Sequence, residues 1–161
     1  MDIYTIKNNL FFNLFTILLA SVFPFIVIYF YDNEVNSLSN SWRTPLQPLY
    51  IFSNLLTSFI LYNVPKWKFS SIFLFLLTIF SIDHFQIVHN IFAILFFLSN
   101  IYPMMKVKKY NLSVYLYLMA IIWFPNVLYF ETHAVLVLCG YHLLLLLKYH
   151  SIMKKRHSEE N

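Results

Sequence analysis

Glycine and cysteine are almost absent from this chain, which contains one of each, Gly140 and Cys139. A lone cysteine inside an apolar run excludes a disulfide or a cysteine zinc cluster within one chain. A single glycine excludes a glycine-rich phosphate loop and leaves little scope for close helix packing through glycine. The chain also contains no HExxH motif, no GxSxG motif and no row of arginines typical of a voltage sensor.

Charged residues are also scarce, at 11% of the 161 residues, whereas 60% are hydrophobic. This composition is too apolar for a soluble domain of this size. A membrane-spanning helix needs about 20 mostly apolar residues, and little sequence beyond the segment between Asp32 and Gln47 is left for loops. The sequence therefore predicts an all-α, polytopic membrane helix bundle with a single transmembrane domain over residues 1–161.

Six transmembrane helices are predicted, with approximate bounds 10–31, 49–63, 67–82, 85–105, 110–124 and 127–149. Pro24 predicts a kink in the first helix, and Pro125 with Asn126 predicts the turn before the last. Six crossings place both termini on one side. Every lysine and arginine except Arg43 then falls on that side: Lys7, Lys66, Lys68, Lys106, Lys108, Lys109, Lys148, Lys154, Lys155 and Arg156. By the positive-inside rule, we expect an integral multi-pass protein with N- and C-termini in the cytoplasm.

The formal net charge of +4 does not indicate a nucleic-acid partner. The basic residues form short clusters beside apolar runs rather than one basic face of a soluble domain. We therefore interpret them as topology signals, and membrane lipids are the expected partners.

Ionisable side chains near the outer face are the first candidates for a functional site. Such groups cost about 2.5 to 3.5 kcal/mol at the centre of a membrane helix and often mark function. Asp83 lies in the outer turn between the third and fourth helices. His89 lies about one turn inside the fourth helix, and Glu131 lies at similar depth in the last. If these two helices face each other, His89 is expected to pair with Glu131.

A second group of polar residues is expected deeper in the membrane. Helical spacing places His142 on the same face as Glu131, about 16 Å deeper, and Asn100 on the same face as His89. We expect His142 and Asn100 to line a polar path, with Asn54 of the second helix as a further lining residue.

Structural roles are equally open for these residues. A carboxylate bonded to a histidine can simply lock two helices together, and His142 can be a neutral histidine bonded to a backbone carbonyl. A zinc site would require the fold to bring His89, Asp83 and Glu131 together, because no tight ligand spacing exists in the sequence. We therefore expect no cofactor, with zinc as the alternative.

Several short motifs resemble the Frag/DRAM/Sfk superfamily of small six-helix membrane proteins. The central helix of that family is similar to the segment containing Asp83, His89-Asn90, Ala93, Phe96-Phe97, Ser99 and Tyr102. Its last helix carries a glutamate and, eleven residues later, a histidine after an aromatic residue, as in Glu131 and Tyr141-His142. The loop Asn36-Ser37-Leu38-Ser39 resembles the family's serine-containing motif, although Asn36 stands where the family has proline and Leu138 where it has asparagine.

The resemblance to the branch that remodels the lipid of GPI anchors implies a function directed at lipids. We predict a protein that binds or remodels lipid through a polar site near the outer leaflet, where Glu131 and His89 hydrogen-bond a headgroup. One alternative is an intramembrane hydrolase or acyltransferase with His89 as general base, oriented by Glu131 or Asp83. Another is a non-enzymatic membrane subunit that forms a homo-oligomer or binds another membrane protein, or a pore lined by Asn54, Asn100 and His142.

Overall fold

The computed structural model describes residues 10–106 and 111–159, and these residues form helices and turns with no β-strand. The prediction of an all-α fold is thus confirmed for the described part of the chain. The α-helices are α1 (Leu10–Tyr31), α2 (Gln47–Tyr62), α3 (Lys68–Ile79), α4 (Ile82–Met105), α5 (Asn111–Met119) and α6 (Val127–Glu159). Short 3₁₀ helices are η1 (Leu38–Arg43), η2 (Pro65–Trp67) and η4 (Ala120–Trp123).

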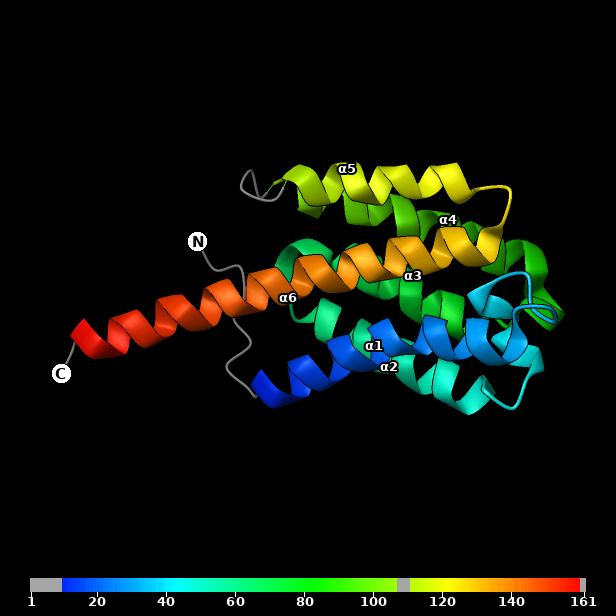
Figure 1. Ribbon diagram of the computed structural model, residues 1–161, viewed down its shortest axis with the longest axis horizontal. Helices are drawn as coiled ribbons and strands as arrows, with labels where there is room; N and C mark the ends of the chain where they lie inside the picture. The colour runs from blue at the N-terminus through cyan, green and yellow to red at the C-terminus, as the bar shows by residue number, and fades with distance from the viewer. Residues whose placement is uncertain (1–9, 107–110, 160–161) are drawn as a thin grey trace.

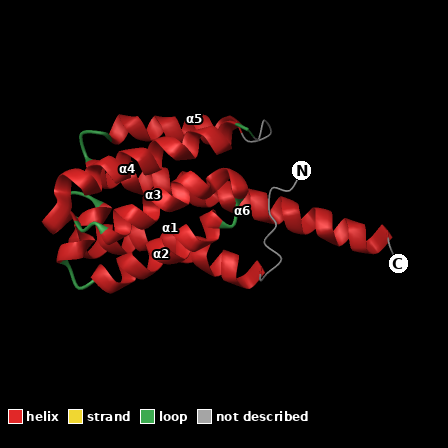
Figure 2. Cartoon of the chain, turned by 180° about the vertical axis from the view of Figure 1, so that it is seen from behind, coloured by secondary structure: helices red, strands yellow, loops and turns green. Residues whose placement is uncertain are grey.

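The helices lie roughly side by side and alternate in direction along the chain (Figure 1). Consecutive helices α1 to α2, α2 to α3 and α3 to α4 pack on each other, and α6 packs on both α1 and α5. Figure 2 shows the same bundle from behind, with η1 and the α3–α4 and α5–α6 turns at one end. We call this the η1 end, and the end where α1 begins and α6 leaves the bundle the opposite end.

The helix bounds follow local chemistry closely. The first helix has the predicted bounds, with Pro24 inside it. The first turn of α2 contains a proline. Backbone N–H groups in the first turn have no intrahelical acceptor, so the N–H that proline lacks costs the helix no hydrogen bond. Phe85 has non-helical angles (φ −134°, ψ 45°), so α4 is kinked where the sequence placed its start. The predicted helix 110–124 changes at Ala120 into the 3₁₀ helix η4.

The last helix is the clearest departure from the predicted bounds. It continues to Glu159 instead of stopping near residue 149. The added segment contains mainly good helix formers and neither proline nor glycine, so nothing in its sequence ends the helix. Its last turns project beyond the other helices (Figure 1).

Three of the described helices are long and apolar enough to cross a membrane: Leu10–Tyr31, Ile82–Met105 and Val127–Ile152. The other described helices are shorter, with 16 residues in α2 and 12 in α3. At 1.5 Å per residue these two span about 24 and about 18 Å, less than the roughly 30 Å of a hydrocarbon core. Length and composition therefore mark α1, α4 and α6 as the candidate spans.

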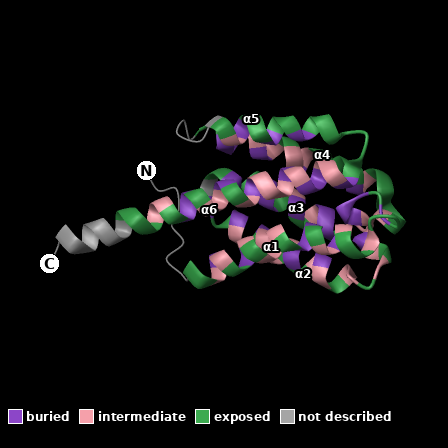
Figure 3. Ribbon diagram, in the orientation of Figure 1, coloured by how far each residue is buried: buried purple, intermediate pink, exposed green. Residues whose placement is uncertain are grey.

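Apolar side chains cover the outside of the bundle, and polar side chains lie inside it. Tyr29 is 83% exposed and Ile87 is 77% exposed, and exposed residues run along the outer faces of several helices (Figure 3). Soluble monomers rarely expose contiguous apolar surface of this extent. Inside, the hydroxyl groups of Ser58 and Ser71 each donate to the other residue's backbone carbonyl, at 2.9 and 2.8 Å, and join α2 to α3. This distribution suits a bundle surrounded by lipid.

The described basic residues follow the alternation of the helices. Lys66 and Lys68 flank the α2–α3 turn, Lys106 follows α4, and Lys148 lies in the distal half of α6, all toward the opposite end. The η1 end carries Arg43. Three residues used in the topology prediction, Lys7, Lys108 and Lys109, lie outside the described residues.

Candidate functional site

Glu131 connects the start of α6 to the loop after α1. One of its carboxyl oxygens accepts a hydrogen bond from the backbone N–H of Leu38 at 2.6 Å. Leu38 is the first residue of η1, and the Ser37 side chain caps the same end by accepting from the Asn40 N–H at 3.3 Å. The first N–H groups of a helix have no intrahelical acceptor, so a carboxyl group there satisfies a donor that would otherwise be buried without a partner.

Aromatic residues close the bundle around this contact. The Tyr50 and Ser39 hydroxyl groups are 3.4 Å apart, which joins α2 to η1. The Tyr50 ring also packs against Phe23, at 5.9 Å between ring centroids, and against Trp42, at 6.4 Å. These contacts hold η1 over the ends of α1, α2 and α6.

The expected pair between His89 and Glu131 is not formed, and this prediction was wrong. The Nδ1 atom of His89 lies 2.7 Å from the backbone carbonyl oxygen of Phe80. Phe80 ends α3 in an extended conformation, so its carbonyl group has no helical N–H to accept from. Glu131 and His89 thus each bind a backbone group at the end of a neighbouring helix. The prediction considered only which side chains share a helix face.

Asp83 has a third, separate partner. It lies in the first turn of α4 and forms an ion pair with the Nε atom of Arg43 in η1 at 2.5 Å. The two side chains are 35% and 62% exposed. The structure therefore does not bring Asp83, His89 and Glu131 together, and among the described residues no three His, Cys, Asp or Glu side chains are grouped to hold a metal ion.

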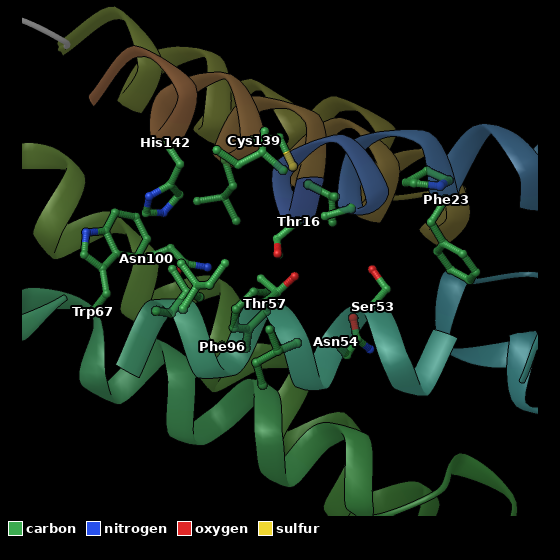
Figure 4. A pocket seen from close by; sticks show the side chains of 18 of the residues that line it. Thr16, Phe23, Ser53, Asn54, Thr57, Trp67, Phe96, Asn100, Cys139 and His142 are labelled. Atoms are coloured by element: carbon green, nitrogen blue, oxygen red, sulfur yellow. The ribbon is translucent and has the colours of Figure 1, made fainter. Parts of the chain in front are cut away.

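A cavity of about 110 Å³ lies between α1, α2 and α6, with α3 and α4 behind it. The structure places all three residues of the predicted polar path, Asn54, Asn100 and His142, on its wall. Figure 4 shows Trp67, Asn100 and His142 at one end, Phe23, Ser53 and Asn54 at the other, and Thr16, Thr57 and Cys139 between them. We call these the inner end and the outer end of the cavity. The outer end lies beneath η1, because Leu38 and Tyr50 also line it.

The wall of the cavity is mainly apolar. The polar lining residues are neutral apart from one histidine: Asn13, Thr16, Tyr50, Ser53, Asn54, Thr57, Asn100 and His142. The described lining residues include no Lys, Arg, Asp or Glu. Cavities with apolar walls and a few polar groups are typical binding sites for small or amphipathic molecules.

Aromatic and amide groups shape the inner end. The ring centroids of Trp67 and His142 are 4.3 Å apart, with an angle of 60° between the ring planes. Asn100 is completely buried, and its Nδ2 donates to the Tyr117 hydroxyl at 3.4 Å. The Tyr117 hydroxyl in turn donates to the backbone carbonyl of Phe97 at 3.0 Å.

Sequence reasoning missed Asn13 and Thr16, the polar lining residues that α1 contributes. They are three residues apart and both buried in a helix that is otherwise strongly apolar. Polar residues at this spacing share one helix face, so the pattern was a readable signal that the first helix turns a polar face inward.

Comparisons with models of protein families, with curated proteins and with solved structures found no match to this chain. The resemblance to the Frag/DRAM/Sfk superfamily therefore stays a prediction.

Proposed function

We propose that this chain is a multi-pass membrane protein that binds membrane lipid in the cavity between α1, α2 and α6. The observation that carries the proposal is the wall of this cavity, which is mainly apolar with a few polar groups, inside a bundle with an apolar exterior. The apolar part can hold a segment of an acyl chain, and the polar groups can hydrogen-bond the less apolar part of the molecule. The resemblance to lipid-remodelling membrane proteins points in the same direction.

The proposed topology is six crossings with both termini in the cytoplasm. The alternating helices and the basic residues at the α2–α3 turn support it. The short helices α2 and α3 can cross where the bilayer thins locally around them. In this orientation η1 and the outer end of the cavity face the outer leaflet. Tyr50, Ser53 and Asn54 are the polar groups that we propose to act there, in place of the predicted pair of Glu131 and His89.

Cysteine labelling tests this topology. In a Cys139→Ser background, a membrane-impermeant maleimide added to intact cells should label Asn33→Cys, an exposed position after α1. Lys66→Cys, exposed in the α2–α3 turn, should react only after the membrane is permeabilised. Labelling of Lys66→Cys in intact cells would overturn the proposed orientation.

A cavity-filling substitution tests lipid binding. Ala20 lines the cavity from α1, whereas Val22 on the same helix is exposed and is not a lining residue. Native mass spectrometry of gently extracted protein should show a lipid adduct on the wild type and on Val22→Phe, and should lose it on Ala20→Phe. An adduct of equal occupancy on Ala20→Phe would show that lipid binds elsewhere and would refute the proposal.

A pore is the second candidate function, favoured by the position of Asn54, Asn100 and His142 on one cavity wall. It predicts ion conductance by purified protein in planar bilayers, which Ala20→Phe should block. Lipid binding without conductance would favour the first proposal.

A further inference from the structure

We infer that the inner end of the cavity is a subsite for the hydroxyl group of an uncharged lipid. This inference rests on the proposed function and specifies its ligand. Three features of the cavity support it: the direction of one hydrogen-bond chain, two buried oxygen atoms and the charge of the wall.

The hydrogen-bond chain fixes the orientation of the Asn100 amide. The Tyr117 hydroxyl has one proton, which it donates to the backbone carbonyl of Phe97. Toward Asn100 the hydroxyl can therefore only accept, so the Asn100 atom that faces it must be the NH₂ group. The Oδ1 atom of Asn100 is consequently the side-chain atom left over, and it has no hydrogen-bond partner among the described residues.

Asn13 presents a second such atom from the other side of the cavity. Its side chain is 5% exposed, and its Oδ1 also has no hydrogen-bond partner among the described residues. Buried polar atoms of folded proteins are nearly always hydrogen-bonded, to protein, water or ligand. Both residues line the cavity, and a carbonyl oxygen accepts but cannot donate, so whatever satisfies the two atoms must supply one O–H or N–H donor to each.

The charge of the wall restricts the donor further. The described lining residues include neither a lysine or arginine to neutralise a phosphate or carboxylate nor an acidic residue to neutralise an ammonium group, so His142 is the one basic side chain on the described wall. Burying an unpaired ion costs far more than burying a hydroxyl group that finds an acceptor. The ligand class is thus an uncharged amphiphile, with an apolar body along Ile17, Leu61 and Leu138 and a hydroxyl group that donates to Asn100. Because one hydroxyl group has one proton, Asn13 requires a second donor, either a water molecule or a second hydroxyl group of the same lipid.

A matched pair of ligands tests this subsite. Oleyl alcohol and its methyl ether have the same chain, but only the alcohol can donate. In native mass spectrometry titrations from detergent micelles, we expect the wild type to bind the ether about tenfold more weakly than the alcohol. Oleate, which is anionic at neutral pH, should bind more weakly than the alcohol. Asn100→Leu should bind alcohol and ether equally, and its binding of the ether at wild-type affinity will show that the variant is folded.

Each result is decisive. Equal wild-type affinity for alcohol and ether would mean that water satisfies both oxygens and would overturn the subsite, although lipid binding itself would stand. Tighter binding of oleate would also overturn it. Binding of none of the three, with no lipid adduct from the membrane, would instead refute the proposed function. If Asn100→Leu does not fold, Asn100→Ala provides the same comparison. Mono-oleoylglycerol and cholesterol then distinguish linear from sterol alcohols, and binding of either that depends on its hydroxyl group supports the subsite.

Discussion

Replacing Glu131 with alanine tests the contact that joins α6 to η1. The carboxyl oxygen accepts from the Leu38 N–H at 2.6 Å, and both residues are buried. Alanine removes the acceptor and leaves the N–H buried with no replacement from the side chain. A buried donor that loses its partner costs about 1–3 kcal/mol, so we expect the free energy of unfolding to fall by about 2 kcal/mol.

Glutamine separates the acceptor from the rest of the side chain. Glu131→Gln keeps a carbonyl oxygen at nearly the same position, so its loss should stay below about 1 kcal/mol. Thermal unfolding in detergent, followed by circular dichroism, should show a Tm about 4–8 °C lower for Glu131→Ala, taking about 2–4 °C per kcal/mol at this chain length. Glu34→Ala, an exposed acid at the same end of the bundle, is the control and should change stability by less than about 0.5 kcal/mol.

A second measurement connects this contact to the cavity. Leu38 lines the outer end, so freeing η1 should also lower the occupancy of the lipid adduct on Glu131→Ala. If Glu131→Gln loses as much stability as Glu131→Ala, hydrogen-bond acceptance from Leu38 is not what stabilises this end, and the reasoning fails.

Three further predictions concern contacts away from the cavity. His89→Ala should lower the free energy of unfolding by about 2–4 kcal/mol, because it leaves the Phe80 carbonyl unpaired and a void beside it. Lipid affinity should not change, since His89 is not a lining residue of the cavity. A selective loss of lipid binding would contradict this structural role. A double-mutant cycle on Arg43 and Asp83 should give a coupling below about 1 kcal/mol that disappears in high salt, because both side chains are partly exposed; a coupling above 2 kcal/mol would refute this. Ser58→Leu should lower the free energy of unfolding by about 1–3 kcal/mol from overfilling the α2–α3 interface alone, and further because it removes a hydrogen bond. Ser58→Ala should cost less, because it removes only the hydrogen bond. Unfolding in detergent measures both.

The sequence predicted the helices well because membrane-like composition leaves few alternatives. Apolar runs separated by prolines and polar turns identify α1 and the α5–α6 turn almost to the residue. The bounds that were missed depend on weaker signals. The end of α6 lies in a charged segment that stays helical because it contains no proline or glycine. The 3₁₀ helix η4 is not indicated by the pattern of apolar residues.

The candidate site was predictable only where side chains face other side chains. The spacing of Glu131 and His142 on one helix face, and of His89 and Asn100 on another, led to His142 and Asn100 on one cavity wall. It failed for Glu131 and His89, because their partners are backbone groups of Leu38 and Phe80. Such groups are present at every helix end, so residue identity does not reveal which side chain will reach them.

The reciprocal bonds between Ser58 and Ser71 bear on how the chain enters a membrane during synthesis. Alone, α2 and α3 are each short for a spanning segment, and each would expose a serine hydroxyl to hydrocarbon. Joined by the turn that carries Lys66, they satisfy both hydroxyl groups within one hairpin. In the proposed six-crossing topology, the pair is thus suited to partition into lipid as a single unit beside α1, on which α2 packs.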